Sequence, residues 1–319
     1  MEGHCEEVFA RRRTYVRAVG FGVLLLCFAA GVWFSFAYFT DPISLRAQSA
    51  SAAASHPALQ AFAGISLVAK SAIVIDADSR EVLYQENSDA QLPLASLSKV
   101  PLILAVSEVL SPESVVTIEH ATSEISSAGI LRAGTQWRVK DLMSYTLVAS
   151  SNDGALILAQ AADESLSAKY SVPAGSAAVS RMNSLARELG LRSIYFLNPT
   201  GLDESATQSG AYGSAYDVAL LFTYAAKNSL ALFADTATTS ITITSVGGHS
   251  VMATNTDRAL DSIAGIIIGK TGLTDLAGGN LAVVFEHRGK RYVAVVLGSS
   301  DQGRFSDMLQ LVSAIHSNE

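Results

Sequence analysis

Residues 280–297 read NLAVVFEHRGKRYVAVVL, two apolar runs, Asn280–Glu286 and Arg291–Leu297, on either side of the polar stretch HRGK. Valine, phenylalanine and tyrosine favour strands, and a short polar stretch with a glycine favours a tight turn. The stretch therefore predicts a β-hairpin close to the C-terminal end. A second hairpin is predicted near the start of the domain, where Ser71–Asp76 and Glu81–Tyr84 flank the turn ADSR.

The sequence between the two hairpins is mainly helical in pattern. Helix-like apolar spacing occurs in six stretches: Leu94–Leu110, Val139–Val148, Asp153–Ala162, Ala178–Leu189, Ala215–Lys227 and, near the end, Met308–Ile315. Strand-like runs also occur at Ser240–Val246 and Ile263–Ile268. Two N-terminal strands, a helical middle and three C-terminal strands predict an α+β fold. We expect one antiparallel sheet built from both chain ends, flanked by helices, with an inserted helical subdomain and the catalytic cleft between them.

The N-terminal residues have the pattern of a membrane anchor. Hydrophobic residues make up 49% of the chain and the mean hydropathy is +0.31, which is high for a soluble protein. No charged residue occurs from Ala18 to Phe39, a stretch long enough at about 1.5 Å per residue to cross a hydrocarbon core of about 30 Å. Four arginines precede it: Arg11, Arg12, Arg13 and Arg17. A cleaved signal peptide is the alternative.

The positive-inside rule then gives the predicted organisation of the whole chain. Residues 1–17 are expected in the cytoplasm, 18–39 as a single transmembrane helix, 40–62 as an Ala/Ser-rich linker and 63–319 as an extracytoplasmic catalytic domain. That location is either a periplasm or the outer face of a cell with one membrane. The cysteines, Cys5 and Cys27, precede the domain, which excludes disulfides and thiol catalysis there.

The charge balance argues against nucleic acid as a partner. The chain has 22 Lys and Arg against 29 Asp and Glu, a net charge of −7. An acidic domain lacks the basic surface that a polyanion needs.

The sequence Ser96-Leu97-Ser98-Lys99 carries the first chemical signal. Residues three apart at a helix start share a face, so Lys99 can reach the Ser96 hydroxyl. A lysine acts as a base only if burial or a neighbouring positive charge keeps it neutral. Taken alone, an S-x-x-K match would occur by chance in a Ser-rich domain about half of the time.

Two further motifs follow in order. Ser150-Ser151-Asn152 precedes an apolar helical run, where these residue types also serve as ordinary helix N-caps. Lys270-Thr271-Gly272 follows the predicted strand Ile263–Ile268, where a cation and a hydroxyl could bind a carboxylate beside a close-lying backbone. Joint occurrence of S-x-x-K, S-x-N and K-T-G on a helix, a loop and a strand is unlikely by chance.

With these motifs the sequence resembles the penicillin-recognising serine enzymes, and within them the D-alanyl-D-alanine carboxypeptidases, low-molecular-mass penicillin-binding proteins. The resemblance covers about residues 65–315 and implies a DD-peptidase/β-lactamase-like fold. Gly269 and Leu273 depart from the family pattern. The stretches that carry the resemblance are Ala95–Lys99 (ASLSK), Ser150–Gly154 (SSNDG), Phe196–Leu202 (FLNPTGL), Asn255–Asp257 (NTD) and Lys270–Leu281 (KTGLTDLAGGNL).

The resemblance implies a role for each motif residue. Ser96 is expected to be the nucleophile and Lys99 its general base, with Ser150 relaying a proton to the leaving amine and Asn152 orienting the substrate amide. The backbone N–H groups of Ser96 and Leu273 would form the oxyanion hole. Three residues would contribute to binding the terminal carboxylate: Lys270 by its charge, with Thr271 and Gly272 beside it.

By the same resemblance, Arg304 is expected near the K-T-G strand, where it would clamp the substrate carboxylate; an ordinary surface salt bridge is the alternative. The domain's histidines are scattered in sequence and lack ligand spacing, so no metal and no cofactor are predicted. The implied substrate is a peptidoglycan stem peptide ending in D-Ala-D-Ala, and β-lactam antibiotics are implied as acylating inhibitors.

Three alternatives remain open at this point. A D,D-endopeptidase acting on cross-linked peptidoglycan differs from a carboxypeptidase only in its substrate. A β-lactamase shares the three motifs but adds a deacylating carboxylate on a loop that no segment here resembles. A non-catalytic membrane-tethered scaffold would not need all five of the polar side chains Ser96, Lys99, Ser150, Asn152 and Lys270.

Overall fold

A computed structural model describes residues 61–119 and 131–317. Its strands are β1 (Ser71–Asp76), β2 (Val82–Glu86), β3 (Leu92–Pro93), β4 (Val115–Thr117), β5 (Gln136–Arg138), β6 (Tyr195–Phe196), β7 (Ala211–Gly213), β8 (Ser240–Thr244), β9 (Ser250–Thr254), β10 (Ile266–Thr274), β11 (Gly278–His287) and β12 (Lys290–Ser299). The α-helices are α4 (Lys99–Ser107), α5 (Val139–Val148), α6 (Asn152–Tyr170), α7 (Ala177–Glu188), α8 (Ala215–Asn228) and α9 (Gly303–Ser317). Short 3₁₀ turns are η2 (Ala95–Ser98), η3 (Leu230–Leu232), η4 (Ala234–Ala237) and η5 (Leu260–Ser262).

The main sheet is antiparallel and takes its strands from both ends of the domain, as predicted. Its order is β10-β11-β12-β1-β2. The central pairing joins β1 to β12, with Ser71 opposite Leu297 and Asp76 opposite Tyr292. The predicted C-terminal hairpin is β11–β12, with His287 opposite Lys290 across the turn. The strand β10 lies at the edge of this sheet.

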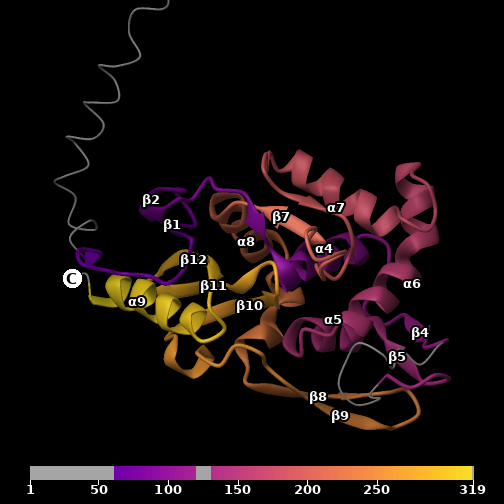
Figure 1. The fold of residues 1–319 in the computed structure, drawn as a ribbon. Helices are drawn as coiled ribbons and strands as arrows, with labels where there is room; N and C mark the ends of the chain where they lie inside the picture. Colours follow the sequence, from indigo (N-terminus) through magenta and orange to yellow (C-terminus); the bar gives the residue numbers. More distant parts are fainter. Residues whose placement is uncertain (1–60, 120–130, 318–319) are drawn as a thin grey trace, which may run out of the picture. The chain divides into compact units, whose positions relative to one another are not determined.

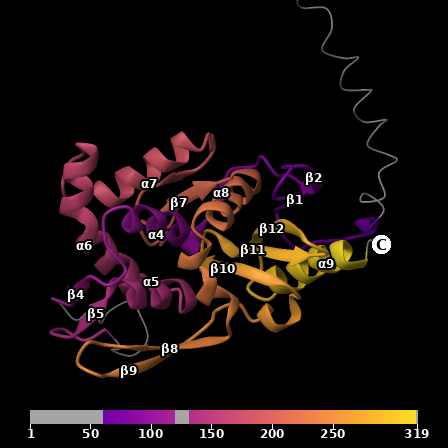
Figure 2. The ribbon, with the colours of Figure 1, turned by 180° about the vertical axis from the view of Figure 1, so that it is seen from behind.

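Helices cover both faces of the sheet, which explains its continuous apolar runs. Successive side chains of a strand point to opposite faces. On β1, Ile73 and Ile75 therefore pack with the cluster that includes α4 and α8, while Ala72 and Val74 pack with the cluster under α9. Figures 1 and 2 show α8 and α9 on opposite sides of the central strands.

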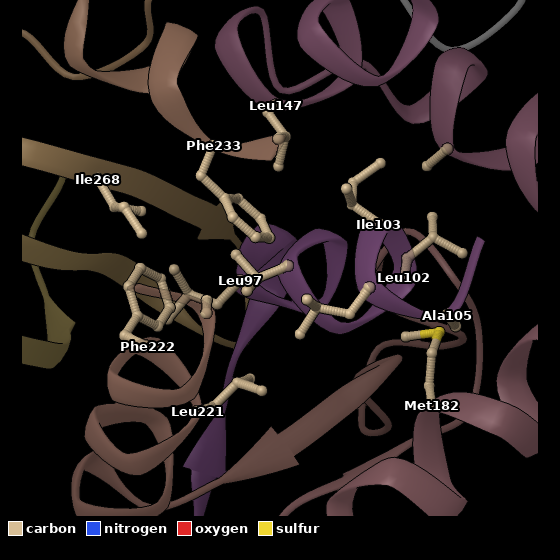
Figure 3. Packing of buried hydrophobic residues seen from close by; sticks show 14 of the residues in the cluster. Leu97, Leu102, Ile103, Ala105, Leu147, Met182, Leu221, Phe222, Phe233 and Ile268 are labelled. Carbon is tan, nitrogen blue, oxygen red and sulfur yellow. The ribbon is translucent and has the colours of Figure 1, made fainter. Parts of the chain in front are cut away.

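The helix α4 lies at the centre of the helical subdomain. Its residues from Lys99 to Val106 are all buried, so no side of the helix is left for solvent. Figure 3 shows Leu102 and Ile103 of α4 among side chains from other elements, including Leu147 of α5 and Met182 of α7. Because α4 follows directly on η2, the turn that contains Ser96, this packing fixes the nucleophile turn in the core.

Several element boundaries differ from the sequence predictions. The helix expected over Leu94–Leu110 begins as the 3₁₀ turn η2 and becomes α-helical only at Lys99, so Pro101 lies in the first turn, where N–H groups have no partner within the helix. The strand expected to end at Ile268 continues to Thr274, so the K-T-G motif lies inside β10. The run at Ser240–Val246 forms a separate two-stranded sheet, β8–β9.

The predicted cytoplasmic segment, transmembrane helix and most of the linker lie outside the described residues. Within residues 61–119 and 131–317, no helix is both long enough and apolar enough to cross a membrane.

Candidate active site

The nucleophile turn is held in an uncommon conformation by two glycines. Ala95, directly before Ser96, has a φ of 49°, in the left-handed region. Gly201 lies so close that a Cβ atom there would be 1.9 Å from the carbonyl oxygen of Ala95. A Cβ atom at Gly272 would be 2.8 Å from the carbonyl oxygen of Leu94 and 3.3 Å from the nitrogen of Ser96. The turn is therefore enclosed on two sides by backbone that no larger residue could supply.

Lys99 is completely buried and faces three oxygen atoms. Its Nζ lies 2.7 Å from Ser96 Oγ and donates to Asn152 Oδ1 at 2.7 Å and to the carbonyl oxygen of Thr200 at 2.9 Å. Burial, followed by the nearby ammonium group of Lys270, holds the pKa of Lys99 well below its usual value of 10.5.

The contacts of Lys99 assign an orientation to its neutral amine. A neutral amine has two N–H groups and one lone pair. The oxygens of Asn152 and Thr200 can only accept hydrogen bonds, so they take both N–H groups. The lone pair is then left for the hydroxyl of Ser96, which can donate to it. This arrangement can remove the serine's proton.

Ser150 and Asn152 are free to face the site because another residue caps α6. The helix N-cap is Ser151, whose Oγ accepts a hydrogen bond from the Gly154 N–H at 3.0 Å. Ser150 has a φ of 55°, a left-handed conformation that is uncommon for residues other than glycine. The capping interpretation of the S-x-N motif is thus right for its middle residue and wrong for the outer two.

Lys270 joins the strand β10 to the loop before α6. Its Nζ donates to Ser150 Oγ at 2.7 Å and to the carbonyl oxygen of Thr271 at 2.8 Å. Burial lowers the pKa of Lys270 from 10.5 to about 7, the Arg304 guanidinium adds to this effect, and the Asp257 carboxylate opposes it. Two lysines of depressed pKa therefore each contact one serine.

The other residues of β10 take different positions. The Thr271 side chain is buried and its hydroxyl hydrogen-bonds to that of Thr256 at 2.6 Å. Gly272 packs on the nucleophile turn, and Leu273 follows it on β10. The Leu273 side chain is half exposed, at 50%. An apolar side chain therefore stands at the lip of the site.

Arg304 reaches the same strand from the start of α9. Its Nη1 donates to the carbonyl oxygen of Gly272 at 2.8 Å and its Nη2 to Asp301 at 2.8 Å. Arg304 is only 4% exposed and forms an ion pair with the half-exposed Asp301, and its contact with a substrate carboxylate stays a prediction. Its Nε has no hydrogen-bond partner within the part of the chain that the structure describes.

The predicted site residues thus converge on one place. Hydrogen bonds connect Ser96 to Asn152 through Lys99, and Lys270 connects Ser150 to β10. The sequence prediction missed the carbonyl oxygen of Thr200, which completes the surroundings of Lys99. Its loop is held by Asn198, whose Oδ1 accepts from the N–H groups of Thr200 and Gly201. The matched stretch FLNPTGL was the available signal for that contact.

The histidines are not all scattered in the structure. The rings of His287 and His316, which are distant in the sequence, have their centroids 4.5 Å apart. Among the described residues, no group of three or more His, Cys, Asp or Glu side chains could hold a metal ion.

Comparison with known proteins decides the family. A family model described as D-alanyl-D-alanine carboxypeptidase matches residues 53–301. The chain belongs to this family. It is similar to the D-alanyl-D-alanine carboxypeptidase DacF of Bacillus subtilis, with 33% identity over 239 residues, which are 73% of this chain and 58% of DacF. This chain therefore spans less than two thirds of that relative's length.

Two further proteins match this chain over most of its length. The D-alanyl-D-alanine carboxypeptidase DacB2 of Mycobacterium tuberculosis is 30% identical over 228 residues, 70% of this chain and 73% of DacB2. Penicillin-binding protein D2 of Listeria monocytogenes, solved in its ampicillin-bound form, superimposes with a TM-score of 0.68 at 28% identity. The superposition covers 79% of this chain and 98% of the Listeria chain. The α+β DD-peptidase fold predicted from the sequence is thereby confirmed.

Proposed function

We propose that this chain is a serine D-alanyl-D-alanine carboxypeptidase that removes the terminal D-Ala from peptidoglycan stem peptides. The observation that carries the proposal is the fully buried Lys99, whose lone pair is directed to Ser96 by two acceptor oxygens. Family membership supports the same reaction.

Acylation uses residues of both the helical subdomain and the main sheet. The Ser96 oxygen attacks the carbonyl carbon between the two D-alanines while Lys99 takes the hydroxyl proton. The N–H groups of Ser96 and Leu273 bind the negative charge that develops on the carbonyl oxygen. The carbon–nitrogen bond then breaks, and the proton that Lys99 took passes to the leaving amine through Ser150, which Lys270 contacts. Water later hydrolyses the ester and restores Ser96.

The remaining site residues hold the substrate. Asn152 orients the amide of the stem peptide, and Lys270, Thr271 and Arg304 provide positive charge and a hydroxyl for the terminal carboxylate. Gly272 lets the substrate's backbone approach β10. Because β-lactams are attacked at a carbonyl in the same way, we propose them as acylating inhibitors, supported by the ampicillin-bound state of the Listeria relative.

The decisive experiment labels the purified chain with a fluorescent penicillin and follows D-Ala release from a peptide ending in D-Ala-D-Ala. We expect one covalent adduct per chain by mass spectrometry, and none with Ser96→Ala. An adduct on Ser96→Ala would overturn the assignment of the nucleophile. Digestion of cross-linked peptidoglycan with product analysis separates the endopeptidase alternative, and rapid turnover of penicillin would indicate a β-lactamase.

We also propose that residues 18–39 anchor the chain in the membrane, with residues 1–17 in the cytoplasm and the catalytic domain outside it. The uncharged stretch and the arginines before it support this proposal. Protease treatment of intact cells or spheroplasts should digest the domain and leave the N-terminal segment protected. Recovery of a mature chain that begins after residue 39 would indicate a cleaved signal instead.

A further inference from the structure

The segment Asn255–Asp257 connects the two parts of the site. The Thr256 N–H donates to the carbonyl oxygen of Val148 at 3.2 Å, two residues before Ser150. The Thr256 hydroxyl shares a hydrogen bond with Thr271 on β10. One short segment therefore ties the loop that carries Ser150 to the strand that carries Lys270.

The side chain of Asp257 is buried beside β10. The residue is 5% exposed, and its Oδ1 accepts a hydrogen bond from the Ala259 N–H at 2.9 Å. Its Oδ2 has no hydrogen-bond partner within residues 61–119 and 131–317. A Cβ atom at Gly269 would lie 3.5 Å from Oδ2. That distance is an ordinary van der Waals contact, so the carboxyl group lies beside residue 269, directly before Lys270.

Of the two cations near this carboxyl group, Lys270 makes no ion pair with any residue that the structure describes. Arg304 is paired with Asp301, which also binds the exposed Arg258. Lys270 contacts two neutral oxygens, Ser150 Oγ and the Thr271 carbonyl. A buried ammonium group is costly without a nearby negative charge.

We propose that Asp257 is a positioning residue that keeps Lys270 in its charged form from its buried position beside Gly269. The proposal rests on the proposed function, in which a charged Lys270 is needed. Asp257 contacts no reacting atom. It acts on the reaction through Lys270, and through Lys270 on the neutral state of Lys99.

The direction of the effect follows from the signs of the charges. An ionised Asp257 raises the pKa of Lys270, while burial and Arg304 lower it. Burial raises the pKa of Asp257 above its usual value, while the Ala259 N–H group, Arg304 and Lys270 favour its ionised form. A charged Lys270 also lowers the pKa of Lys99. The carboxyl group therefore extends to higher pH the range in which Lys270 is charged while Lys99 is neutral.

The test compares two substitutions that each remove one negative charge from the same region. Asp257→Asn is nearly isosteric, and Asp261→Asn removes an exposed carboxylate four residues later. The rate of acylation of the full chain by a fluorescent penicillin is measured from pH 5 to pH 10. We expect the alkaline limb to move down by about one pH unit in Asp257→Asn. It should stay in place in Asp261→Asn.

A purely structural role would lower the rate at every pH without moving the alkaline limb, and that result would overturn the proposal. A direct readout covers the case in which the parent chain is not acylated at all. The ¹³Cε signal of Lys270 in ¹³C-lysine-labelled protein, assigned by its loss in Lys270→Met, should titrate at lower pH in Asp257→Asn. If that variant does not fold, Asp257→Ser takes its place. An unchanged titration overturns the inference even where the proposed function stands.

Discussion

Lys270 Nζ donates a hydrogen bond to Ser150 Oγ at 2.7 Å, across the boundary between the main sheet and the helical subdomain. Lys99 Nζ lies at the same distance, 2.7 Å, from Ser96 Oγ, where its lone pair can accept the hydroxyl proton. The site therefore contains two serine–lysine pairs, of which one lies next to the attacking oxygen and the other is available for the leaving group.

Replacing Lys99 by arginine tests whether the base must be neutral. A guanidinium group keeps its proton at all usable pH values, so Lys99→Arg should reduce acylation by roughly a hundred- to ten-thousand-fold. The rate of labelling by a fluorescent penicillin measures this. Lys169→Arg, at a partly exposed lysine that contacts Glu108, is the matched control and should keep the parent rate. Full activity in Lys99→Arg would refute the proposed base.

Arg304 has a close counterpart in Arg258. Both bind Asp301 and both lie over the ring of Phe305, but Arg258 is largely exposed. If Arg304 holds the substrate carboxylate, Arg304→Ala should raise KM for a D-Ala-D-Ala peptide about tenfold or more, and Arg258→Ala should not. Steady-state kinetics with the free acid and with its C-terminal amide give the comparison. An unchanged KM for the acid would remove Arg304 from the binding site.

Gly201 and Gly190 offer a matched pair for the nucleophile turn. Their φ angles are similar, 76° and 73°, but a Cβ atom at Gly201 would strike Ala95 while one at Gly190 would meet nothing within 4 Å. Gly190→Ala should cost only the backbone strain, about 1 kcal/mol. Gly201→Ala should cost about 3 kcal/mol or more and reduce penicillin labelling. Urea unfolding measures both, and equal losses would contradict the packing described for this turn.

The depressed pKa of Lys270 predicts how stability changes with pH. Between its folded value of about 7 and its usual value of 10.5, the unfolded chain binds a proton that the folded chain does not. The free energy of unfolding should therefore rise with pH over this window, by up to about 1.4 kcal/mol per pH unit from this group. Urea unfolding at pH 7 and pH 9 tests it, and Lys270→Met should show a smaller rise. Equal slopes for parent and variant would argue against the depressed pKa of Lys270.

Most of the fold could be predicted because its strands and helices carry clear apolar patterns. The strand Ser71–Asp76 and the helix Val139–Val148 have the predicted bounds. The continuation of β10 beyond Ile268 could not be predicted, because Gly269 and Lys270 interrupt the apolar run while their backbone still pairs with β11. The short strand β9, Ser250–Thr254, was missed because most of its side chains are not buried.

The predicted site residues gather as expected, but the surroundings that act on them were less visible. The contact from Thr200 comes from a backbone carbonyl, whose position depends on the loop and not on the side chain. Asp257 fitted a family stretch in the sequence, yet its burial beside β10 brings together residues that are distant in the sequence. Long-range packing of this kind leaves no periodic signal.

The pairing of β1 with β12 has a consequence for biosynthesis. Ser71 can pair with Leu297 only after nearly the whole domain has been synthesised. Strand pairing between distant residues is slow because a long loop must close first. A nascent chain that has produced Ser96 still lacks Lys270 and the strands that place it, so the serine gains its reactive surroundings only when synthesis is nearly complete.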